Sequence, residues 1–284
     1  MVLLSITITA KNEAPVIDKV LNNLIKQLND INYEMILIDN WSSDNTFQIL
    51  KKYENNHIKV FRYKGSKGSA RNFALKKADG KYVMALDADQ VYLNLDKFLR
   101  DYFSRYSSYS VKIGRSSFPI ISPKELLMNI GGWRDLQFAE DWDLWFRLAE
   151  ACKYIYLIDY DWVFGEHIRS HKNNYSILSK ILKYMLKYRD LYIVGLPIRP
   201  QNIYNKFLYQ LGMVLSFFKN EKKIVYNCTK YLEIPTDKIE SEMDWDLQFH
   251  YNLIRYQLLT CKNKPIFLEV LSKFENYLKR NYSL

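Results

Sequence analysis

Strand and helix signals alternate along the first 90 residues, and this alternation constrains the fold more than any other feature of the sequence. Short apolar runs recur between segments whose apolar residues follow a helical period. We predict strands at residues 3–9, 34–39, 58–62 and 82–86, with helices at 15–28, 45–53 and 70–78 between them. Strands that alternate with helices form a mostly parallel sheet flanked by helices. The sequence therefore predicts an α/β fold.

From about residue 172 the pattern changes to amphipathic helices alone. We predict them at residues 175–192, 203–218, 242–261 and 266–282, with Lys and Arg among Leu, Ile and Tyr. The predicted organisation is an α/β domain over residues 1–170, followed by a basic α-helical region over residues 171–284.

The positive charge of the chain is concentrated in its helical part. Residues 1–164 hold 22 Lys and Arg against 20 Asp and Glu, whereas residues 165–284 hold 19 against 11, within a total net charge of +10. This excess favours an anionic neighbour such as lipid headgroups or nucleic acid, or it only keeps the chain in solution.

The apolar segments and the cysteines bear on location. No segment reaches the ~20 apolar residues that span a bilayer, and the apolar start has no basic leader, so it is interpreted as a strand. Cys152, Cys228 and Cys261 are odd in number and form no CxxC pair. We therefore predict neither a disulfide framework nor a zinc site. We also predict a reducing, cytoplasmic location, with contact to a membrane surface left open.

The tripeptide Asp87-Ala88-Asp89 follows the strand predicted at residues 82–86. Residues two apart in an extended chain point to one side, so both carboxylates face the sheet edge where α/β proteins bind ligands. Asp39 ends another strand at this edge. Two close carboxylates suit Mg²⁺ or Mn²⁺, which can bridge a diphosphate. An Asp-x-Asp alone is more typical of a surface turn; its place after an apolar strand favours the metal site.

Several segments resemble, in the same order, the family 2 glycosyltransferases, which are nucleotide-diphospho-sugar transferases of the GT-A fold. The segments are Ser5–Ala14, Met35–Thr46, Gly68–Asn72, Ala78–Tyr82 with Leu86–Asp89, and Gly131–Trp133 with Glu140–Leu144. The resemblance runs from about Ser5 to His167. It implies a GT-A domain with a donor-binding half at about residues 1–90 and an acceptor-binding half at about 91–170, extended by the C-terminal helices.

The resemblance also implies roles on the donor side. Glu13 and Asp39 would contact the base and ribose of the nucleotide, and Arg71 would approach the ribose or the diphosphate. Asp87 would orient the donor sugar or ribose, and Asp89 would hold the metal directly.

Three positions depart from the family pattern. Asn40 replaces the usual second acid, Trp41 replaces the usual Gly, and Lys11 stands where an aromatic residue is common. We therefore expect base and ribose recognition to differ from the family norm. Taken without the family, Glu13 and Asp39 could instead cap helices.

The segment from Lys64 to Arg71 is basic and contains glycine. A helix is expected to begin near Ser69. Together with this helix start, the side chains of Lys64, Lys67 and Arg71 would form a positively charged site that suits a diphosphate. A solvated basic loop is the alternative.

On the acceptor side, Glu140, Asp141 and Asp143 open a helix predicted at residues 140–150. By the resemblance, Asp141 would be the general base that takes the proton of the acceptor hydroxyl. Acids also simply favour the first turn of a helix, and a lipid-phosphate acceptor would need no base.

A histidine after the last core strand often completes the metal shell in related transferases, and His167 has this position. Neutral imidazole is a reasonable ligand for Mn²⁺. His171 is the rival, and a plain surface histidine is the third interpretation.

Together these features predict an inverting glycosyltransferase that uses a UDP- or GDP-linked sugar with Mn²⁺ or Mg²⁺ and a glycan or lipid-linked acceptor. Peripheral association of the C-terminal helices with an anionic membrane, or a homodimer, is left open. The alternatives are a nucleic-acid-binding protein, an inactive sugar-nucleotide binder, and a nucleotidyltransferase. The last is disfavoured because residues 9–13 lack glycine, and no nucleic-acid motif is present.

Overall fold

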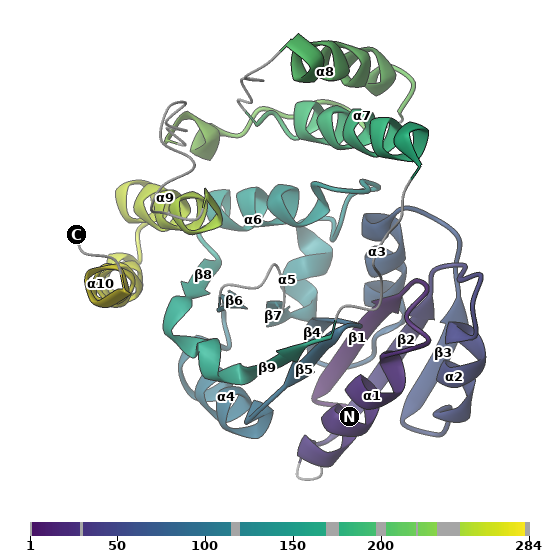
Figure 1. The fold of residues 1–284 in the computed structure, drawn as a ribbon. Coiled ribbons are helices and arrows are strands. Elements are labelled where there is room, and N and C mark those ends of the chain that lie inside the picture. The colour runs from purple at the N-terminus through teal and green to yellow at the C-terminus, as the bar shows by residue number, and fades with distance from the viewer. Residues whose placement is uncertain are drawn as a thin grey trace.

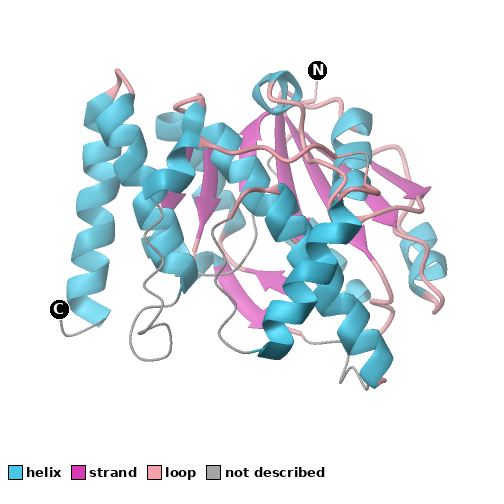
Figure 2. Ribbon diagram, turned by 90° about the horizontal axis from the view of Figure 1, so that it is seen from above, coloured by secondary structure: helices cyan, strands magenta, loops and turns pink. Residues whose placement is uncertain are grey.

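A computed structural model gives the fold of the chain (Figure 1). It describes residues 2–28, 31–114, 120–168, 176–196, 203–219, 221–231 and 245–281. Its centre is a seven-stranded sheet in the order β3-β2-β1-β4-β7-β6-β8. The view turned by 90° shows these strands in the interior with helices around them (Figure 2).

The first part of the chain forms the parallel half of the sheet, and the predicted α/β fold is confirmed. Its elements are β1 (Leu4–Ala10), α1 (Ile17–Gln27), β2 (Tyr33–Asp39), α2 (Thr46–Lys52), β3 (Ile58–Arg62), α3 (Lys67–Lys77) and β4 (Tyr82–Asp87). Alternate residues of β2 face opposite sides: Met35 and Leu37 join the core on the side of α1, whereas Ile36 and Ile38 pack with Ala70 of α3. Successive side chains of a strand point to opposite faces of the sheet, and here both faces are buried, as is usual in a parallel sheet.

The second part completes the sheet with antiparallel pairings. Its elements are β5 (Gln90–Tyr92), α4 (Leu95–Asp101), a π-helical turn (Tyr102–Tyr106), β6 (Ser110–Ile113), β7 (Ile120–Pro123), α5 (Lys124–Asn129), α6 (Glu140–Glu150), β8 (Tyr154–Leu157), a 3-10 turn (Ile158–Val163) and β9 (Phe164–His167). Strand β7 is antiparallel to both β4 and β6, and β6 is parallel to β8. Strands β5 and β9 form a separate antiparallel ribbon.

The predicted helical C-terminal region is confirmed. It contains α7 (Ile177–Ile193), α8 (Ile203–Ser216), a 3-10 turn (Asn227–Tyr231), α9 (Trp245–Thr260) and α10 (Lys264–Asn281). Helices α7 and α8 pack on each other beyond α6, and α9 and α10 lie beside α6 and β8 (Figure 1). Residues 175, 242–244 and 282 of the predicted helices lie outside the described residues. So do residues 169–175, where the predicted domain boundary falls, and the boundary stays a prediction.

Among the helices that the structure describes, none combines the length and the apolar composition that crossing a membrane requires.

The prediction that the cysteines form no disulfide is wrong in the structure. Cys152, after α6, is bonded to Cys261, after α9, with their Cα atoms 5.8 Å apart. The bond joins residues separated by 109 positions, so no short-range cysteine motif predicts it. It forms because α9 packs against α6. Cys228 is a buried free thiol. The argument from the cysteines to a reducing compartment therefore loses its premise.

Candidate active site

Acids end two strands on either side of β1, at the carboxyl edge of the sheet. Asp39 of β2 pairs with Ala10 of β1, and Asp87 of β4 pairs with the adjacent Thr9. This is the edge at which parallel sheets bind their ligands. The structure thus brings together the strand ends that the sequence singled out.

The turns after β1 and β2 are joined by hydrogen bonds into one rim. The backbone N–H of Asn12 donates to Ser42 Oγ at 2.9 Å, and the N–H of Ser43 donates to Asn12 Oδ1 at 2.8 Å. The N–H of Glu13 donates to Thr46 Oγ1 at 2.8 Å. Each of these bonds links one turn to the other, so Glu13 lies on a rim that both turns fix.

Asp39 lies beneath this rim and is fully buried. Its carboxylate accepts hydrogen bonds from the N–H of Ser42, at 3.2 Å and 3.3 Å, and from Arg62 Nε at 3.0 Å. Arg62 in turn lies 4.7 Å from the ring centroid of Trp41, whose side chain is exposed. In this conformation a nucleotide would meet Trp41 and Arg62 before Asp39, so the contact predicted for Asp39 stays a prediction.

Arg71 of α3 joins the strand edge to the acids of α6. Its Nη1 donates to Glu140 Oε1 at 2.7 Å and to Asp141 Oδ1 at 2.6 Å, and its Nη2 lies 3.4 Å from Asp87 Oδ1. The arginine is only 4% exposed. One buried guanidinium therefore balances three carboxylates, two from the predicted acceptor side and one from the predicted donor side. The predicted contact of Arg71 with a diphosphate or ribose stays a prediction.

Trp133 is a further partner of Asp141 that the sequence analysis did not identify. Its Nε1 donates to Asp141 Oδ1 at 3.1 Å. The chain reaches this position through Gly131 and Gly132, whose φ angles are +89° and +62°. A Cβ atom on Gly132 would lie 2.1 Å from Asn72 Oδ1. The Gly-Gly-Trp motif was the available signal, because two glycines before an aromatic residue indicate a tight turn that positions it.

Glu140, the neighbour of Asp141, is almost completely buried. Burial and the charge of Asp141 outweigh the opposite effects of Lys67 and Arg71, and they raise the pKa of Glu140 to about 7. A buried acid beside a second acid gains a proton more readily than an exposed one.

We expect this pKa to make stability depend on pH. The ordinary pKa of a glutamate is 4.5, so between about pH 4.5 and pH 7 the folded chain binds the Glu140 proton and the unfolded chain does not. This contribution to the free energy of unfolding is present below that window and is lost as pH rises through it. Glu140→Gln should therefore gain stability over the wild type as pH rises, as urea unfolding at pH 5 and pH 7.5 would measure. Exposed Glu125→Gln is the control, and equal slopes for both variants would contradict the expectation.

Asp89 and His167 are brought together by the β5–β9 ribbon. Gln90 of β5 pairs with His167 of β9, and the N–H of Ile168 donates to the carbonyl of Asp89 at 2.8 Å. His167 Nε2 lies 3.7 Å from Asp89 Oδ2, too far for a hydrogen bond, and both side chains are accessible. Burial and the charge of Asp87 raise the pKa of Asp89. His171, the rival of His167, lies outside the described residues.

The donor set around Asp89 is small. Over the described part of the chain, no group of three or more His, Cys, Asp and Glu could hold one. Asp89 and His167 offer one carboxylate and one imidazole, a combination that suits Mn²⁺. Such a pair fits an ion that takes its other ligands from a bound diphosphate and water, as nucleotide-bound Mg²⁺ commonly does.

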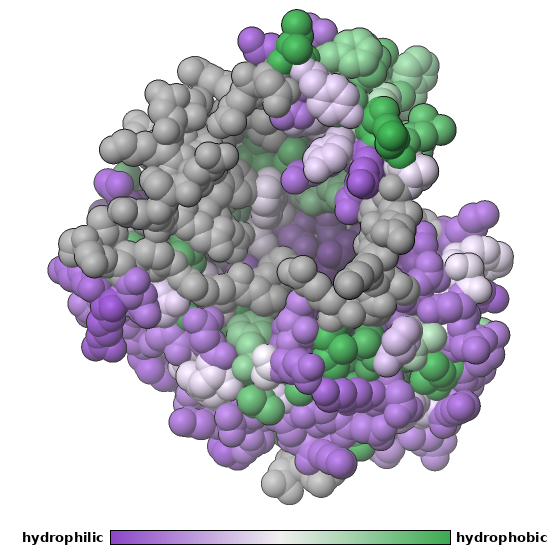
Figure 3. All heavy atoms as spheres, in the orientation of Figure 1, coloured by the Kyte–Doolittle hydropathy of each residue, from purple (hydrophilic) through white to green (hydrophobic). Residues whose placement is uncertain are grey.

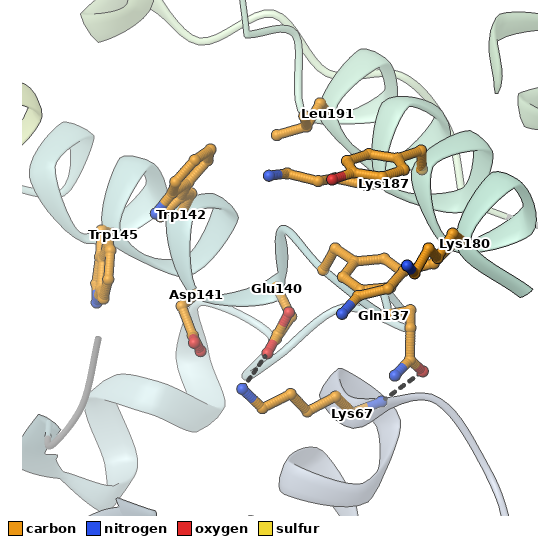
Figure 4. Close-up of a pocket in the computed structure, with 12 residues that line it drawn as sticks. Lys67, Gln137, Glu140, Asp141, Trp142, Trp145, Lys180, Lys187 and Leu191 are labelled. Atoms are coloured by element: carbon orange, nitrogen blue, oxygen red, sulfur yellow. Dashed lines mark hydrogen bonds and ion pairs between the residues drawn. The ribbon is translucent and has the colours of Figure 1, made fainter. Parts of the chain in front are cut away.

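A cavity of about 730 Å³ opens beside Asp141, between α6 and α7. Residues from three helices line it, among them Lys67, Glu140, Asp141, Trp142, Lys180 and Lys187 (Figure 4). The same face of the molecule is hollowed below the α7–α8 pair, with hydrophilic side chains at its floor (Figure 3). The acids held by Arg71 therefore face a space large enough for a saccharide-sized ligand.

Comparison with known proteins places the first part of the chain. Residues 5–102 match the profile of glycosyl transferase family 2. Over 99 residues the chain is 35% identical to "Poly(ribitol-phosphate) beta-N-acetylglucosaminyltransferase TarS" of Staphylococcus aureus, a match of 33% of this chain and 17% of that protein. Over 94 residues it is 34% identical to "UDP-Glc:alpha-D-GlcNAc-diphosphoundecaprenol beta-1,3-glucosyltransferase WfgD" of Escherichia coli, a match of 32% of this chain and 36% of that protein. The matches thus span well under half of these relatives.

Solved structures confirm the GT-A fold. S. aureus TarS 1–349 in complex with UDP-GlcNAc superposes with a TM-score of 0.51 at 20% identity, over 97% of this chain and 89% of that one. Mannosyltransferase PcManGT from Pyrobaculum calidifontis, in complex with GDP-Man and Mn²⁺, gives 0.54 at 15% identity, over 97% of this chain and 80% of that one. The likeness therefore includes the C-terminal helices as well as the sheet.

Proposed function

We propose that this chain, whose residues 5–102 match glycosyl transferase family 2, transfers a sugar from a nucleoside-diphosphate donor to a hydroxyl of a glycan or lipid-linked acceptor. The observation that carries the proposal is the position of Arg71, which holds Asp87 at the strand edge and Asp141 at the cavity. Named glycosyltransferases among the relatives, and neighbours that bind UDP-GlcNAc and GDP-Man, support it.

On the donor side, we assign the nucleotide to the rim that carries Glu13, with Asp39 acting through Arg62. Asp89 and His167 would hold Mn²⁺ or Mg²⁺, and the bound ion would neutralise charge on the diphosphate. Asp87, between this pair and Arg71, would orient the donor sugar. The accessibility of the Asp89–His167 pair supports this arrangement.

On the acceptor side, Asp141 is the proposed general base. The acceptor hydroxyl oxygen forms a bond to the anomeric carbon from the face opposite the leaving group, which inverts the configuration. The bond from that carbon to the diphosphate oxygen breaks, and its electron pair leaves with the nucleoside diphosphate. The hydroxyl proton goes to the Asp141 carboxylate, which Arg71 and Trp133 hold at the cavity wall.

The experiment is a donor panel. The protein is incubated with UDP-Glc, UDP-GlcNAc or GDP-Man, with Mn²⁺ or with EDTA, and release of nucleoside diphosphate is measured. We expect one donor to be cleaved slowly to free sugar with Mn²⁺ and not with EDTA. Binding without release would favour an inactive sugar-nucleotide binder. Salt-dependent DNA binding with no response to any donor would contradict the proposal in favour of nucleic-acid binding.

We further propose that the α7–α8 pair rests on an anionic membrane. Exposed apolar side chains on this pair and in the turn after it include Ile177, Ile203, Phe207, Phe217 and Phe218, the last 83% exposed. Hydrophobic side chains gather on the upper part of the molecule, where α7 and α8 lie (Figure 3). A large exposed apolar patch marks an interaction site, and the basic charge of residues 165–284 favours anionic lipid over a second copy of the chain.

The membrane proposal predicts co-sedimentation with phosphatidylglycerol vesicles that weakens as salt is raised. Replacing Phe207, Phe217 and Phe218 with Ser should reduce partitioning at least tenfold, since burying one such side chain is worth about 1.5–3 kcal/mol. The control replaces Leu259 and Leu268, exposed on α9 and α10, and should bind as the wild type does. Absence of binding at low salt, or a dimer in sedimentation that the Phe variant abolishes, would contradict membrane docking.

A further inference from the structure

One face of α7 carries lysines toward the cavity. Lys180, Lys183 and Lys187 follow each other at intervals of three and four residues, the spacing that places side chains on one face of a helix. All three line the cavity beside Asp141, and Lys180 and Lys187 are seen across it from the acids of α6 (Figure 4). We call these three residues the lysine row.

Among the described residues, the two acids of the cavity are paired with cations other than Lys180 and Lys187. Glu140 and Asp141 are bound by Arg71, and Glu140 also lies 3.5 Å from Lys67 Nζ. Within the described ranges, Lys180 and Lys187 form no salt bridge. The wall formed by α7 therefore presents positive charge to the cavity, while the acids on the opposite wall are already paired with Arg71 and Lys67. A concave wall of one charge attracts a ligand of the other.

The lysine row lies on the acceptor side of Asp141. The donor edge is formed by the ends of β2 and β4, and its Asp87 is joined through Arg71 to Asp141 of the cavity. Asp39, Asp87 and Asp89 do not line the cavity, and of the cavity residues Lys67 is the one whose charge acts on Asp89. The diphosphate of the donor thus has its own place, and the lysine row faces the ligand that approaches Asp141 from α7. Trp142, also in the wall, offers an apolar ring to the carbon skeleton of such a ligand.

We propose that the lysine row binds a phosphate group of the acceptor. The inference rests on the proposed function, because it takes Asp141 as the place where the acceptor hydroxyl reacts. Ammonium groups bind phosphate through charge-assisted hydrogen bonds. The phosphate belongs either to a phosphodiester-linked alditol polymer or to the diphosphate of a lipid carrier, and both present the same group to the lysines.

The test measures binding of phosphate probes by calorimetry. One arm uses a soluble glycerol-phosphate oligomer with glycerol as its neutral match, and the other uses farnesyl diphosphate in detergent with farnesol as its match. The lysine row is replaced as Lys180→Gln, Lys183→Gln and Lys187→Gln together. The control removes the same charge from exposed Lys26, Lys52 and Lys76 on α1, α2 and α3. Binding of UDP with Mn²⁺ is measured on every variant.

We expect at least one phosphate probe to bind the wild type and its neutral match not to bind. The lysine-row variant should weaken that binding about tenfold or more, as the loss of several charge-assisted bonds requires, while the control stays within about twofold. The arm that binds identifies the source of the phosphate. No binding of either probe to the wild type, or equal weakening in both variants, would overturn the inference. UDP binding reports separately on the donor site, so failure of the proposed function would be seen there.

Discussion

Asp141→Asn is expected to lower kcat for sugar transfer by a factor of about 10²–10⁴, the contribution typical of a positioned general base. Asparagine keeps the size of the side chain and can still accept from Trp133, but its amide cannot take a proton from the acceptor hydroxyl. Since Asp141 lies on the acceptor side of Arg71, the affinity for donor should change little. The effect should therefore appear in kcat.

The measurement is the rate of transfer at saturating donor, together with UDP affinity in the presence of Mn²⁺. Asp159→Asn, an exposed acid in the turn after β8, is the control and should transfer at the wild-type rate. A rate for Asp141→Asn within twofold of the wild type would contradict the base assignment. It would point instead to an acceptor oxygen that is already ionised when it attacks.

Arg71→Ala is expected to lower the free energy of unfolding by about 3–5 kcal/mol, the cost of removing one partner from a buried ion pair. The substitution leaves Glu140, Asp141 and Asp87 without the guanidinium that lies between them. The remaining carboxylates repel one another and must rehydrate or take up protons. Arg71→Lys should recover part of the lost stability, because an ammonium group restores the positive charge but cannot bind several carboxylates through separate planar N–H donors as a guanidinium does.

Urea unfolding at pH 7 measures this loss. The control is Arg100→Ala, which removes an exposed arginine whose partner Asp96 lies on the same helix. Exposed pairs of this spacing contribute only about 0.3–0.5 kcal/mol, so the control should remain close to the wild type. A loss below about 1 kcal/mol for Arg71→Ala would show that the three carboxylates do not depend on this cation.

Local pattern was enough to predict the sheet edge. Strand β3 begins and ends where its apolar period predicts, at Ile58 and Arg62, and acids that follow apolar strands meet at one edge because parallel strands share a direction. Helix α3 begins three residues earlier than predicted. Ser66 caps it by accepting a hydrogen bond from the N–H of Ser69. The loop contains several serines and glycines that could each cap a helix, so the sequence did not determine at which residue the helix begins.

Contacts between distant segments could not be predicted in this way. The partners of Arg71 lie up to 70 residues away and the disulfide spans 109, whereas hydrophobic period reports only on neighbours along the chain. The same holds for Gln90 and His167, which the β5–β9 ribbon brings together. The spacing of three and four residues in the lysine row can be read from the sequence, but what the row faces depends on the position of α7 across the cavity from α6.

We propose above all that Asp89, together with His167, binds a divalent ion that in turn binds the diphosphate of the donor. Calorimetric titration of UDP and GDP, with Mn²⁺ and with EDTA, tests it on the wild type, on Asp89→Asn and on the control Asp96→Asn, which changes a partly exposed acid on α4. We predict that one nucleotide binds the wild type and the control only with Mn²⁺, and that Asp89→Asn weakens this binding at least about tenfold, as removal of a metal ligand should. Equal binding of the nucleotide in EDTA, or an unchanged response to Mn²⁺ in Asp89→Asn, would contradict the claim.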